Sequence, residues 1–271
     1  TTLFLNERFL EEEITADFPG VGSPIVYLKL IAHSENIKTS FSGNHPDSLH
    51  MLQLDDTQIV GRGVDRIVYA HPSDPHLCVK IARCNFSTDY VVKGARDYLY
   101  YALRSFNKEY FDFNFIDVRY ACRLAQRGEE KIFFHHLPRC YGFVETNLGK
   151  GVLWQRIRNF DGSDCFSLRD CYLTPGLLGE NEKELIWAAL DQFFAWQMKN
   201  AIMLREMAFT NTLVCRIDPQ IIRLYHIDAI GCADIIPLAD HAGWFARMRI
   251  WSKIRSFRKQ ITKWLDGRLE K

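Results

Sequence analysis

The chain has 271 residues, of which 47% are hydrophobic and 25% are charged, with 34 basic against 33 acidic side chains. This length suggests one large domain or two lobes, and the apolar fraction excludes extensive disorder. A net charge of +1 excludes a uniformly basic coat protein, so we do not expect nucleic acid as a partner. The charge is uneven, because residues 241–271 carry a net +7 and leave residues 1–240 at −6.

The eight cysteines contain no C-x-x-C pair, which argues against a zinc site, and they are too sparse for a secreted disulfide scaffold. We therefore expect a reducing, cytoplasmic compartment and cysteines that act as small buried hydrophobes. No apolar run is long enough to span a bilayer, and the start lacks the features of a signal peptide. Because the chain does not begin with Met, its start can be trimmed, so a secreted effector stays open. Peripheral membrane association stays open because of the basic C-terminal residues described below.

The predicted elements follow one another as strands first and helices later. Residues 1–50 form a separate N-terminal extension in which we find no chemistry. Beyond it, the residue patterns predict strands over 57–60, 67–70, 77–81, 141–146 and 152–157, a helical region over 89–126, and a hairpin turn in the linker 147–151. A long helix over 181–200, strands over 212–215 and 221–227, and a helical remainder complete the chain. This order predicts an α+β fold with two lobes, residues 51–158 and 159–271.

Two candidate sites lie on the first predicted strands. Gly61-Arg62-Gly63 stands between two strands, where backbone amides could approach phosphate oxygens, although two glycines in a hairpin are usually only a turn. Lys80 is the one charge in the apolar strand around it. It either points to solvent from an alternating strand or is the point charge that orients the phosphates of a bound nucleotide.

Two further sites follow the long helix. The loop 204–211 places Glu206 five residues before Asn211, an acid and an amide at the spacing that a phosphoryl-transfer loop needs. Asp228 ends an apolar strand, where a carboxylate is poorly solvated unless it binds a cation or hydrogen-bond donors. The order and spacing of the four sites are more specific than any one of them.

With these residues in place, the chain resembles the protein-kinase-like fold and, within it, the YrbL-type family of bacterial PhoP-regulatory-network proteins. The resemblance covers roughly residues 57–265. Its generic part is Gly61–Gly63 with Arg66, Lys80, Asn211 and Asp228, and its family-specific part is the stretch 138–162 together with 230–239.

The resemblance implies a bilobal fold, with an antiparallel-sheet N-lobe carrying one helix, a mostly helical C-lobe, and ATP with Mg²⁺ bound between them. The roles that it implies are phosphate contacts from Gly61, Arg62, Gly63 and Lys80, a lysine-pairing acid at Glu109 (with Asp97 and Asp112 on nearby turns), a hinge at Arg158–Asp161, and metal ligands at Asn211 and Asp228.

The catalytic loop departs from the family of active kinases at two positions. Glu206 stands where the catalytic aspartate is usual, and Ala208 stands where a lysine neutralises the transferred phosphate. A displacement of ~1 Å can cost ~10²-fold in rate. Loss of a fixed positive charge costs roughly 10²–10³-fold. Arg205 is the candidate to replace that charge, so we assign catalytic roles to Glu206, Lys80 and Arg205.

Three functions stay open. The first is an atypical kinase that transfers phosphate to an unknown acceptor, for example a protein. The second is a pseudokinase that binds a nucleotide or acts as a scaffold, and the third is a membrane-associated or partner-binding regulator built on the same fold. Glu206 and Ala208 favour the second, whereas Lys80, Asn211 and Asp228 favour the first, toward which we lean.

Residues 244–265 alternate tryptophan and other apolar residues with Arg and Lys at helical spacing. This pattern predicts a basic amphipathic helix or a bent pair of helices. One interpretation is contact with an anionic membrane surface or an acidic partner, including the acidic remainder of this chain. The other is a helix whose tryptophans pack on the core, and we favour it because most amphipathic helices of globular proteins face a core.

Overall fold

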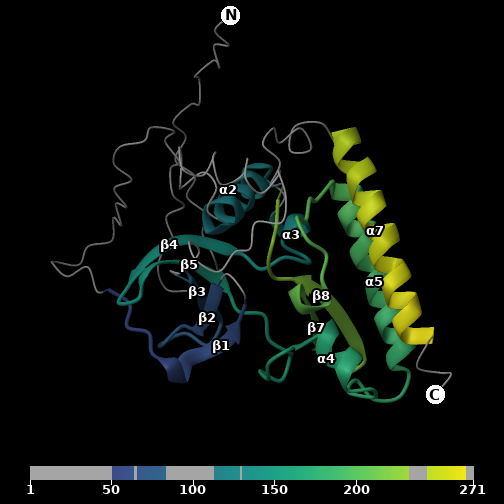
Figure 1. The fold of residues 1–271 in the computed structure, drawn as a ribbon, viewed down its shortest axis with the longest axis horizontal. Coiled ribbons are helices and arrows are strands. Elements are labelled where there is room, and N and C mark those ends of the chain that lie inside the picture. The colour runs from purple at the N-terminus through teal and green to yellow at the C-terminus, as the bar shows by residue number, and fades with distance from the viewer. Residues whose placement is uncertain (1–50, 64–65, 84–112, 129, 232–242, 267–271) are drawn as a thin grey trace, which may run out of the picture. The chain divides into compact units, whose positions relative to one another are not determined.

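The first group of elements is a five-stranded antiparallel sheet in the order β1-β2-β3-β5-β4 (Figure 1). The computed structural model describes residues 51–63, 66–83, 113–128, 130–231 and 243–266. The strands, which follow the short helix η1 (Asp56–Gln58), are β1 (Ile59–Arg62), β2 (Arg66–Ala70), β3 (Leu77–Ala82), β4 (Cys140–Thr146) and β5 (Gly149–Gln155).

Strand β3 lies between β2 and β5 in the sheet, and its four middle residues are all buried, which shows that both faces of the strand are covered. This explains its continuous apolar run, since only strands that face solvent on one side need to alternate. Val79 packs with Leu54, Tyr69 and Ile81 in a small apolar cluster. The turn between β4 and β5 has two residues, shorter than the predicted linker.

Helix α2 (Phe113–Gln126) packs against β4 and β5, and the short helix α3 (Glu130–Phe133) follows it. The predicted helical region is confirmed for 113–126, and its part 89–112 lies outside the described residues. Residues 1–50 also lie outside them. That residues 1–50 form a separate extension stays a prediction. The predicted lobe boundary near residue 158 stays a prediction.

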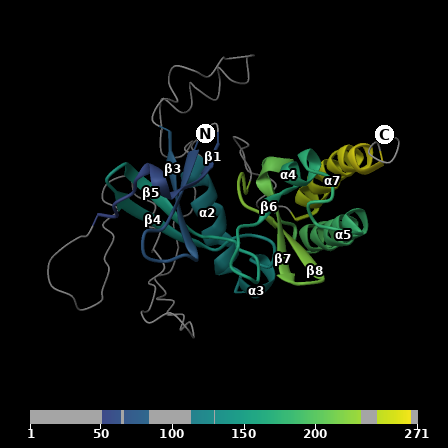
Figure 2. The ribbon, with the colours of Figure 1, turned by 90° about the horizontal axis from the view of Figure 1, so that it is seen from below.

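The second group of elements combines a small antiparallel sheet, in the order β6-β7-β8, with three α-helices and one short 3-10 helix (Figure 2). The elements are β6 (Phe166–Ser167), α4 (Leu168–Leu173), α5 (Glu182–Asn200), the short helix η2 (Phe209–Asn211), β7 (Thr212–Asp218), β8 (Ile221–His226) and α7 (Gly243–Asp266). Helix α5 contacts β8 on one side and α7 on the other. The sequence pattern predicted α5, β7 and β8, but it did not predict β6 and α4.

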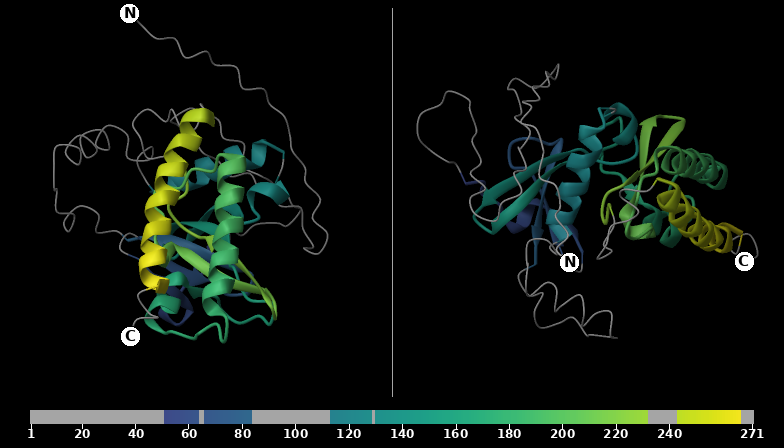
Figure 3. Two further views of the ribbon diagram at one scale, coloured as in Figure 1. Left: turned by 90° about the vertical axis from the view of Figure 1, so that its right-hand side faces the viewer. Right: turned by 90° about the horizontal axis from the view of Figure 1, so that it is seen from above.

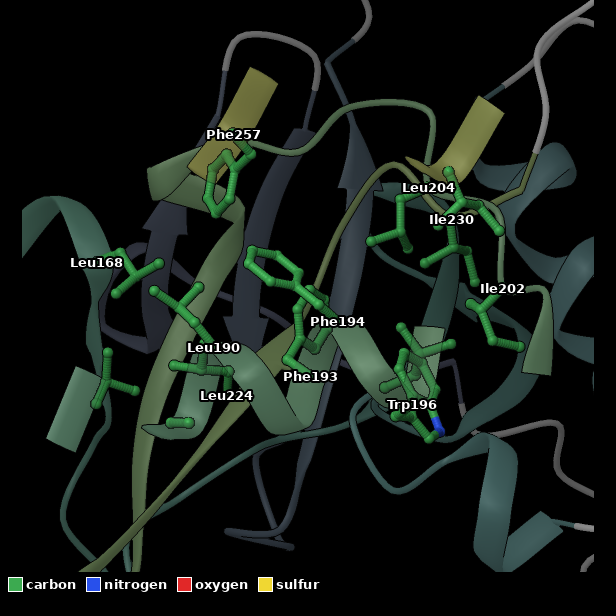
Figure 4. Close-up of a cluster of buried hydrophobic side chains, with 14 of the residues drawn as sticks. Leu168, Leu190, Phe193, Phe194, Trp196, Ile202, Leu204, Leu224, Ile230 and Phe257 are labelled. Atoms are coloured by element: carbon green, nitrogen blue, oxygen red, sulfur yellow. The ribbon is translucent and has the colours of Figure 1, made fainter. Parts of the chain in front are cut away.

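The main core lies where α5, β8 and α7 meet, and Phe193 stands at its centre with its side chain fully buried (Figure 4). Its ring is stacked on Trp196 at 5.7 Å and lies 5.5 Å from the ring of His136. Phe257 and Ile261 of α7 are buried in the same core. Burial of these large apolar side chains supplies most of the stabilising free energy of this half.

The α+β class and the antiparallel sheet are therefore confirmed. The tail forms a single helix, α7, so the alternative of a bent pair is wrong. Our favoured interpretation of its tryptophans holds for Trp264, which is buried, but is wrong for Trp244 and Trp251, which are exposed. In the described part of the chain, no helix is both long enough and apolar enough to cross a bilayer.

Candidate functional site

Five charged side chains meet where β2, β3 and α2 approach the loops that follow α5 and β8. We call Arg66, Lys80, Asp117, Arg205 and Asp228 the charged cluster. Its members come from sequence positions up to 162 residues apart. Only the tertiary structure brings them together.

Arg66, at the start of β2, joins the two carboxylates of the cluster. Its Nη1 donates to Asp117 Oδ2 at 2.6 Å and to Asn114 Oδ1 at 3.1 Å, and its Nη2 pairs with Asp228 Oδ1. The side chain is buried, so these charge-assisted hydrogen bonds are only weakly screened by water. Arg66 therefore fixes the distance between α2 and the loop after β8.

Lys80 is buried in the centre of β3, with its ammonium group over the ring of Trp154 at 4.8 Å. Its Nζ donates to the carbonyl oxygen of Ile227 and lies 3.8 Å from Asp228 Oδ1. Burial, reinforced by the neighbouring Arg66 and opposed by Asp117, lowers the pKa of Lys80 from its ordinary value of 10.5 to about 8. The alternative that Lys80 points to solvent is wrong.

Asp117 is the acid that the sequence analysis missed. It lies on α2, is buried, and accepts from Arg66 at 2.6 Å and from Arg205 at 2.5 Å. Burial alone would raise the pKa of its carboxyl, but Arg205, Arg66 and Lys80 outweigh burial and lower it. A signal was present, since Asn114 and Asp117 stand in helical phase with buried Ala121 and Leu124, where apolar residues are normal.

Two loops that carry predicted residues are hydrogen-bonded to each other. Arg205 N donates to the carbonyl of Ala229 at 2.6 Å, and Gly231 N donates to the carbonyl of Met203 at 2.8 Å. Ala229 has a φ of 54°, a left-handed conformation that costs a residue with a Cβ roughly 1–2 kcal/mol. Gly231 also has positive φ, and a Cβ there would lie 2.9 Å from the ring of Tyr120. The loop around Asp228 is thus held in one conformation.

Asn211 and Asp228 flank the paired ends of β7 and β8. The amide of Ile227 donates to the carbonyl of Asn211 at 2.9 Å, and Thr212 pairs with His226 in the β7–β8 ladder. The structure therefore brings the two predicted metal ligands to the same end of this hairpin. Carboxylate and carboxamide oxygens are the donors that Mg²⁺ prefers. The described residues hold no group of three or more His, Cys, Asp or Glu that could bind a metal unaided.

The two predicted catalytic residues of the loop, Arg205 and Glu206, lie in different surroundings. The side chain of Arg205 is largely buried, and it is engaged with Asp117 and with the carbonyl of Ile230. Glu206 is exposed. Lys253 of α7 holds the backbone between them, because its Nζ donates to the carbonyl of Leu204 and, at 2.8 Å, to that of Arg205.

The remaining predicted residues lie on β1, in the predicted hinge, or outside the described chain. Glu109 lies outside it. Gly61 and Arg62 end β1 and Gly63 follows, its amide donating to the carbonyl of Arg66 at 2.8 Å.

In the predicted hinge, Arg158 Nε lies 4.0 Å from Asp164 and has no hydrogen-bond partner within the described ranges. Asp161 is exposed and accepts from Ser163 N and Oγ, contacts that lower the pKa of its carboxyl.

Two buried histidines lie next to Phe193 of the core. His136 Nδ1 is 2.7 Å from the carbonyl oxygen of Leu224, and His226 Nδ1 is 3.3 Å from Thr212 Oγ1. Burial lowers the pKa of His136 to about 4 and that of His226 to about 3, the latter with help from Lys80. Both side chains are therefore neutral at pH 7.

The fold and the site define an α+β protein in which a buried charged cluster links an antiparallel sheet to a helical half. The chain belongs to the family described as PhoP regulatory network protein YrbL, whose model matches residues 52–262. The predicted family is thereby confirmed.

Two bacterial relatives show the same likeness. The "Uncharacterized protein YrbL" of Escherichia coli (strain K12) is 26% identical over 214 residues, which cover 79% of this chain and 85% of that protein. The protein of the same description from Shigella flexneri matches with the same values. The ATP, the Mg²⁺ and the kinase activity that the resemblance implied stay predictions.

Proposed function

We propose that this protein binds ATP with Mg²⁺ at the charged cluster and transfers the γ-phosphate, slowly, to an acceptor that the sequence does not identify. The observation that carries the proposal is the meeting of Lys80 with Asp228, whose atoms Nζ and Oδ1 are 3.8 Å apart. In phosphoryl transfer, a buried lysine orients the phosphates and an aspartate holds the metal ion that bridges them.

The charge balance of the cluster supports an anionic ligand. Within the described residues it combines three cations with two carboxylates, an excess of one positive charge in a buried place. An unbalanced buried charge is costly, and the lowered pKa of Lys80 is one expression of that cost. A phosphate group close to Lys80 would balance the charge and keep the lysine protonated.

The donors suit a magnesium ion. The contacts of Asp228 with Arg66 and Lys80 both involve Oδ1, and the side chain is 34% exposed, so we assign Oδ2 as the metal ligand. The Asn211 carboxamide would supply a second oxygen, and phosphate oxygens and water would complete the shell. The ion would supply charge neutralisation to the bound phosphates, while Lys80 and Arg66 keep Asp228 oriented.

Backbone features on both sides of the cluster also favour a ligand. A Cβ at Gly61 would meet only Val68, at 3.7 Å, so the fold itself does not require glycine there. A backbone that must approach phosphate oxygens closely does favour glycine. The strained conformation of Ala229, next to Asp228, is the kind of feature that clusters at functional sites.

A second candidate function, a pseudokinase that binds a nucleotide without transferring phosphate, is favoured by the positions of Arg205 and Glu206. Arg205 is engaged with Asp117 and the carbonyl of Ile230, so it is not free to replace the charge that Ala208 lacks. Glu206 is exposed to solvent, whereas a general base must be positioned within hydrogen-bond reach of the proton that it accepts.

The first experiment is a thermal-shift titration with ATP, with and without Mg²⁺. We expect metal-dependent stabilisation of the wild type, about 2.7 kcal/mol when ATP is at 100 times its Kd. Asp228→Asn should remove the metal dependence, whereas the matched control Asp218→Asn, at the exposed end of β7, should keep it. A wild type that ATP and Mg²⁺ do not stabilise would contradict both candidate functions.

The second experiment separates the two functions. Single-turnover loss of the γ-phosphate is measured for the wild type and for Glu206→Gln. A kinase in which Glu206 is the base should lose about 10²–10⁴-fold in rate. Binding without turnover in the wild type identifies the pseudokinase, and equal measurable rates in both proteins exclude Glu206 as the base.

A further inference from the structure

Helix α7 has an outward face that the core does not use. Trp244, Met248 and Trp251 are 72%, 53% and 56% exposed, although each is a large apolar side chain. The helix lies beside α5 and runs along the outside of this group of elements (Figure 3). Exposed large apolar groups that gather on one surface typically mark a place of interaction.

The exposed residues form one continuous stripe. Positions 244, 248, 251, 255 and 259 follow each other by three or four residues, so they share one face of a helix with 3.6 residues per turn. The stripe is apolar in its first two turns and becomes basic at Arg255 and Lys259, which are both exposed. The guanidinium of Arg255 lies over the ring of Trp251 at 5.5 Å.

The opposite face holds the helix firmly in place. Ile250, Phe257 and Ile261 are buried in the core. On the flanks, Arg247 donates to the carbonyls of Met198 and Lys199 at the end of α5, both at 3.3 Å. The exposed stripe is therefore presented on a fixed helix.

We propose that this stripe docks α7 flat on a bilayer that contains anionic lipids. The indole rings of Trp244 and Trp251 would lie at the level of the headgroups, where tryptophan is enriched in membrane proteins. Arg255 and Lys259 would contact lipid phosphates. The net charge of +7 on residues 241–271, against −6 on the remainder, turns this end of the molecule toward an anionic surface.

A bilayer fits the stripe better than an acidic protein does. The apolar and basic residues succeed each other along one exposed face of a single helix. A flat interface with an apolar layer beneath charged headgroups matches this arrangement over the whole length of the stripe. An acidic protein would pair with the cations but would leave two tryptophans and a methionine to be covered separately.

The test is co-sedimentation of the full chain with vesicles that contain phosphatidylglycerol, compared with vesicles of phosphatidylcholine alone, across a salt series. We expect binding to the anionic vesicles only, and weaker binding as salt rises. Arg255→Glu with Lys259→Glu should reduce the affinity by at least 30-fold, roughly the value of two cations close to an anionic surface. Trp244→Ser with Trp251→Ser should cause a comparable loss.

Matched controls use exposed residues elsewhere. Leu173→Ser and Arg169→Glu, both exposed on α4, should leave vesicle binding unchanged. Quenching of tryptophan fluorescence by brominated lipid adds a direct readout, which should disappear in the double tryptophan variant. Since the changed side chains of α7 are exposed, these variants should unfold at the same temperature as the wild type.

Three results would overturn the proposal. The first is no sedimentation with anionic vesicles at low salt, and the second is equal sedimentation with neutral vesicles. The third is binding to polyglutamate, a mimic of an acidic protein, without binding to vesicles. None of these results bears on ATP binding at the charged cluster, so the two proposals stand or fall separately.

Discussion

Two buried regions of this molecule contain chemically opposite side chains. The core around Phe193 is apolar and aromatic, whereas the charged cluster places Lys80, Asp117 and their partners out of water a short distance away. Apolar burial stabilises a fold directly, but buried ion pairs often do no better than apolar residues of the same volume. Folding stability is therefore a sufficient reason for the apolar core. The charged cluster needs a further reason, which we propose to be the binding of a ligand.

The largest effect should come from removing the acid at the centre of the cluster. Asp117→Asn leaves Arg66 and Arg205 buried without their shared carboxylate, and we expect a loss of about 3–5 kcal/mol in the free energy of unfolding. Phe193→Ala should cost a similar amount through its cavity. Urea denaturation of both variants measures these losses.

A second substitution distinguishes the two regions. Asp117→Asn leaves the charge of Arg205 uncompensated, and Arg205→Met removes that charge. The double variant should therefore be more stable than the sum of the two single losses predicts. The same substitution added to Phe193→Ala should be close to additive. If the Asp117–Arg205 pair also proves additive, the cluster is not the electrostatic unit that we describe.

An intermediate effect should appear on acidification. The pKa values of His136 and His226 are about 4 and 3 in the folded state, below the ordinary 6.5, so at pH 5 only the unfolded chain binds their protons. Stability should therefore fall as the pH drops below about 6.5, by about 2 kcal/mol per histidine between pH 7 and pH 5.

Urea denaturation at the two pH values measures this fall. Replacing both histidines by Gln removes the two groups that titrate and should flatten the dependence, whatever the variant costs at pH 7. The control is His71→Gln, outside the core, which should keep most of the wild-type slope. An unchanged slope in the double variant would show that other groups cause the acid sensitivity.

The smallest effect on stability should come from the residue that matters most for the proposed function. Lys80→Met removes a buried charge whose pKa is lowered, so we expect the free energy of unfolding at pH 7 to change by less than ~1 kcal/mol or to rise. ATP-dependent stabilisation should be lost. A substitution that spares stability and abolishes binding would confirm that the cluster serves a ligand.

The titration of Lys80 gives a second readout of the same variant. Its pKa is about 8 in the folded state and 10.5 ordinarily, so between these values the unfolded chain binds more protons and stability rises with pH. Lys80→Met should abolish this rise, while Lys131→Met, an exposed control on α3, should not. If both variants keep the rise, Lys80 is not the group that titrates.

The residue pattern was sufficient to predict local structure and to find individual candidate residues of the site. Apolar periodicity located α5, β7 and β8, because each buries a face that repeats with the period of its backbone, whereas a continuous apolar run located β3. Lys80 and Asp228 could be found because a charge inside an apolar strand is unusual enough to be noticed. The short elements β6 and α4 carried too few residues for a periodic signal.

The tertiary structure alone decided which charges meet and which side chains stay outside. Asp117 lies 51 residues from Arg66 and 88 from Arg205, and no local pattern pairs residues so far apart. The tryptophans of α7 look alike in sequence, yet Trp264 enters the core while Trp244 and Trp251 face outward. Their fates differ because the neighbouring elements, chiefly α5, cover only one side of the helix. Sequence thus determined the elements and the candidate groups, whereas packing between distant elements determined the site and the free surface.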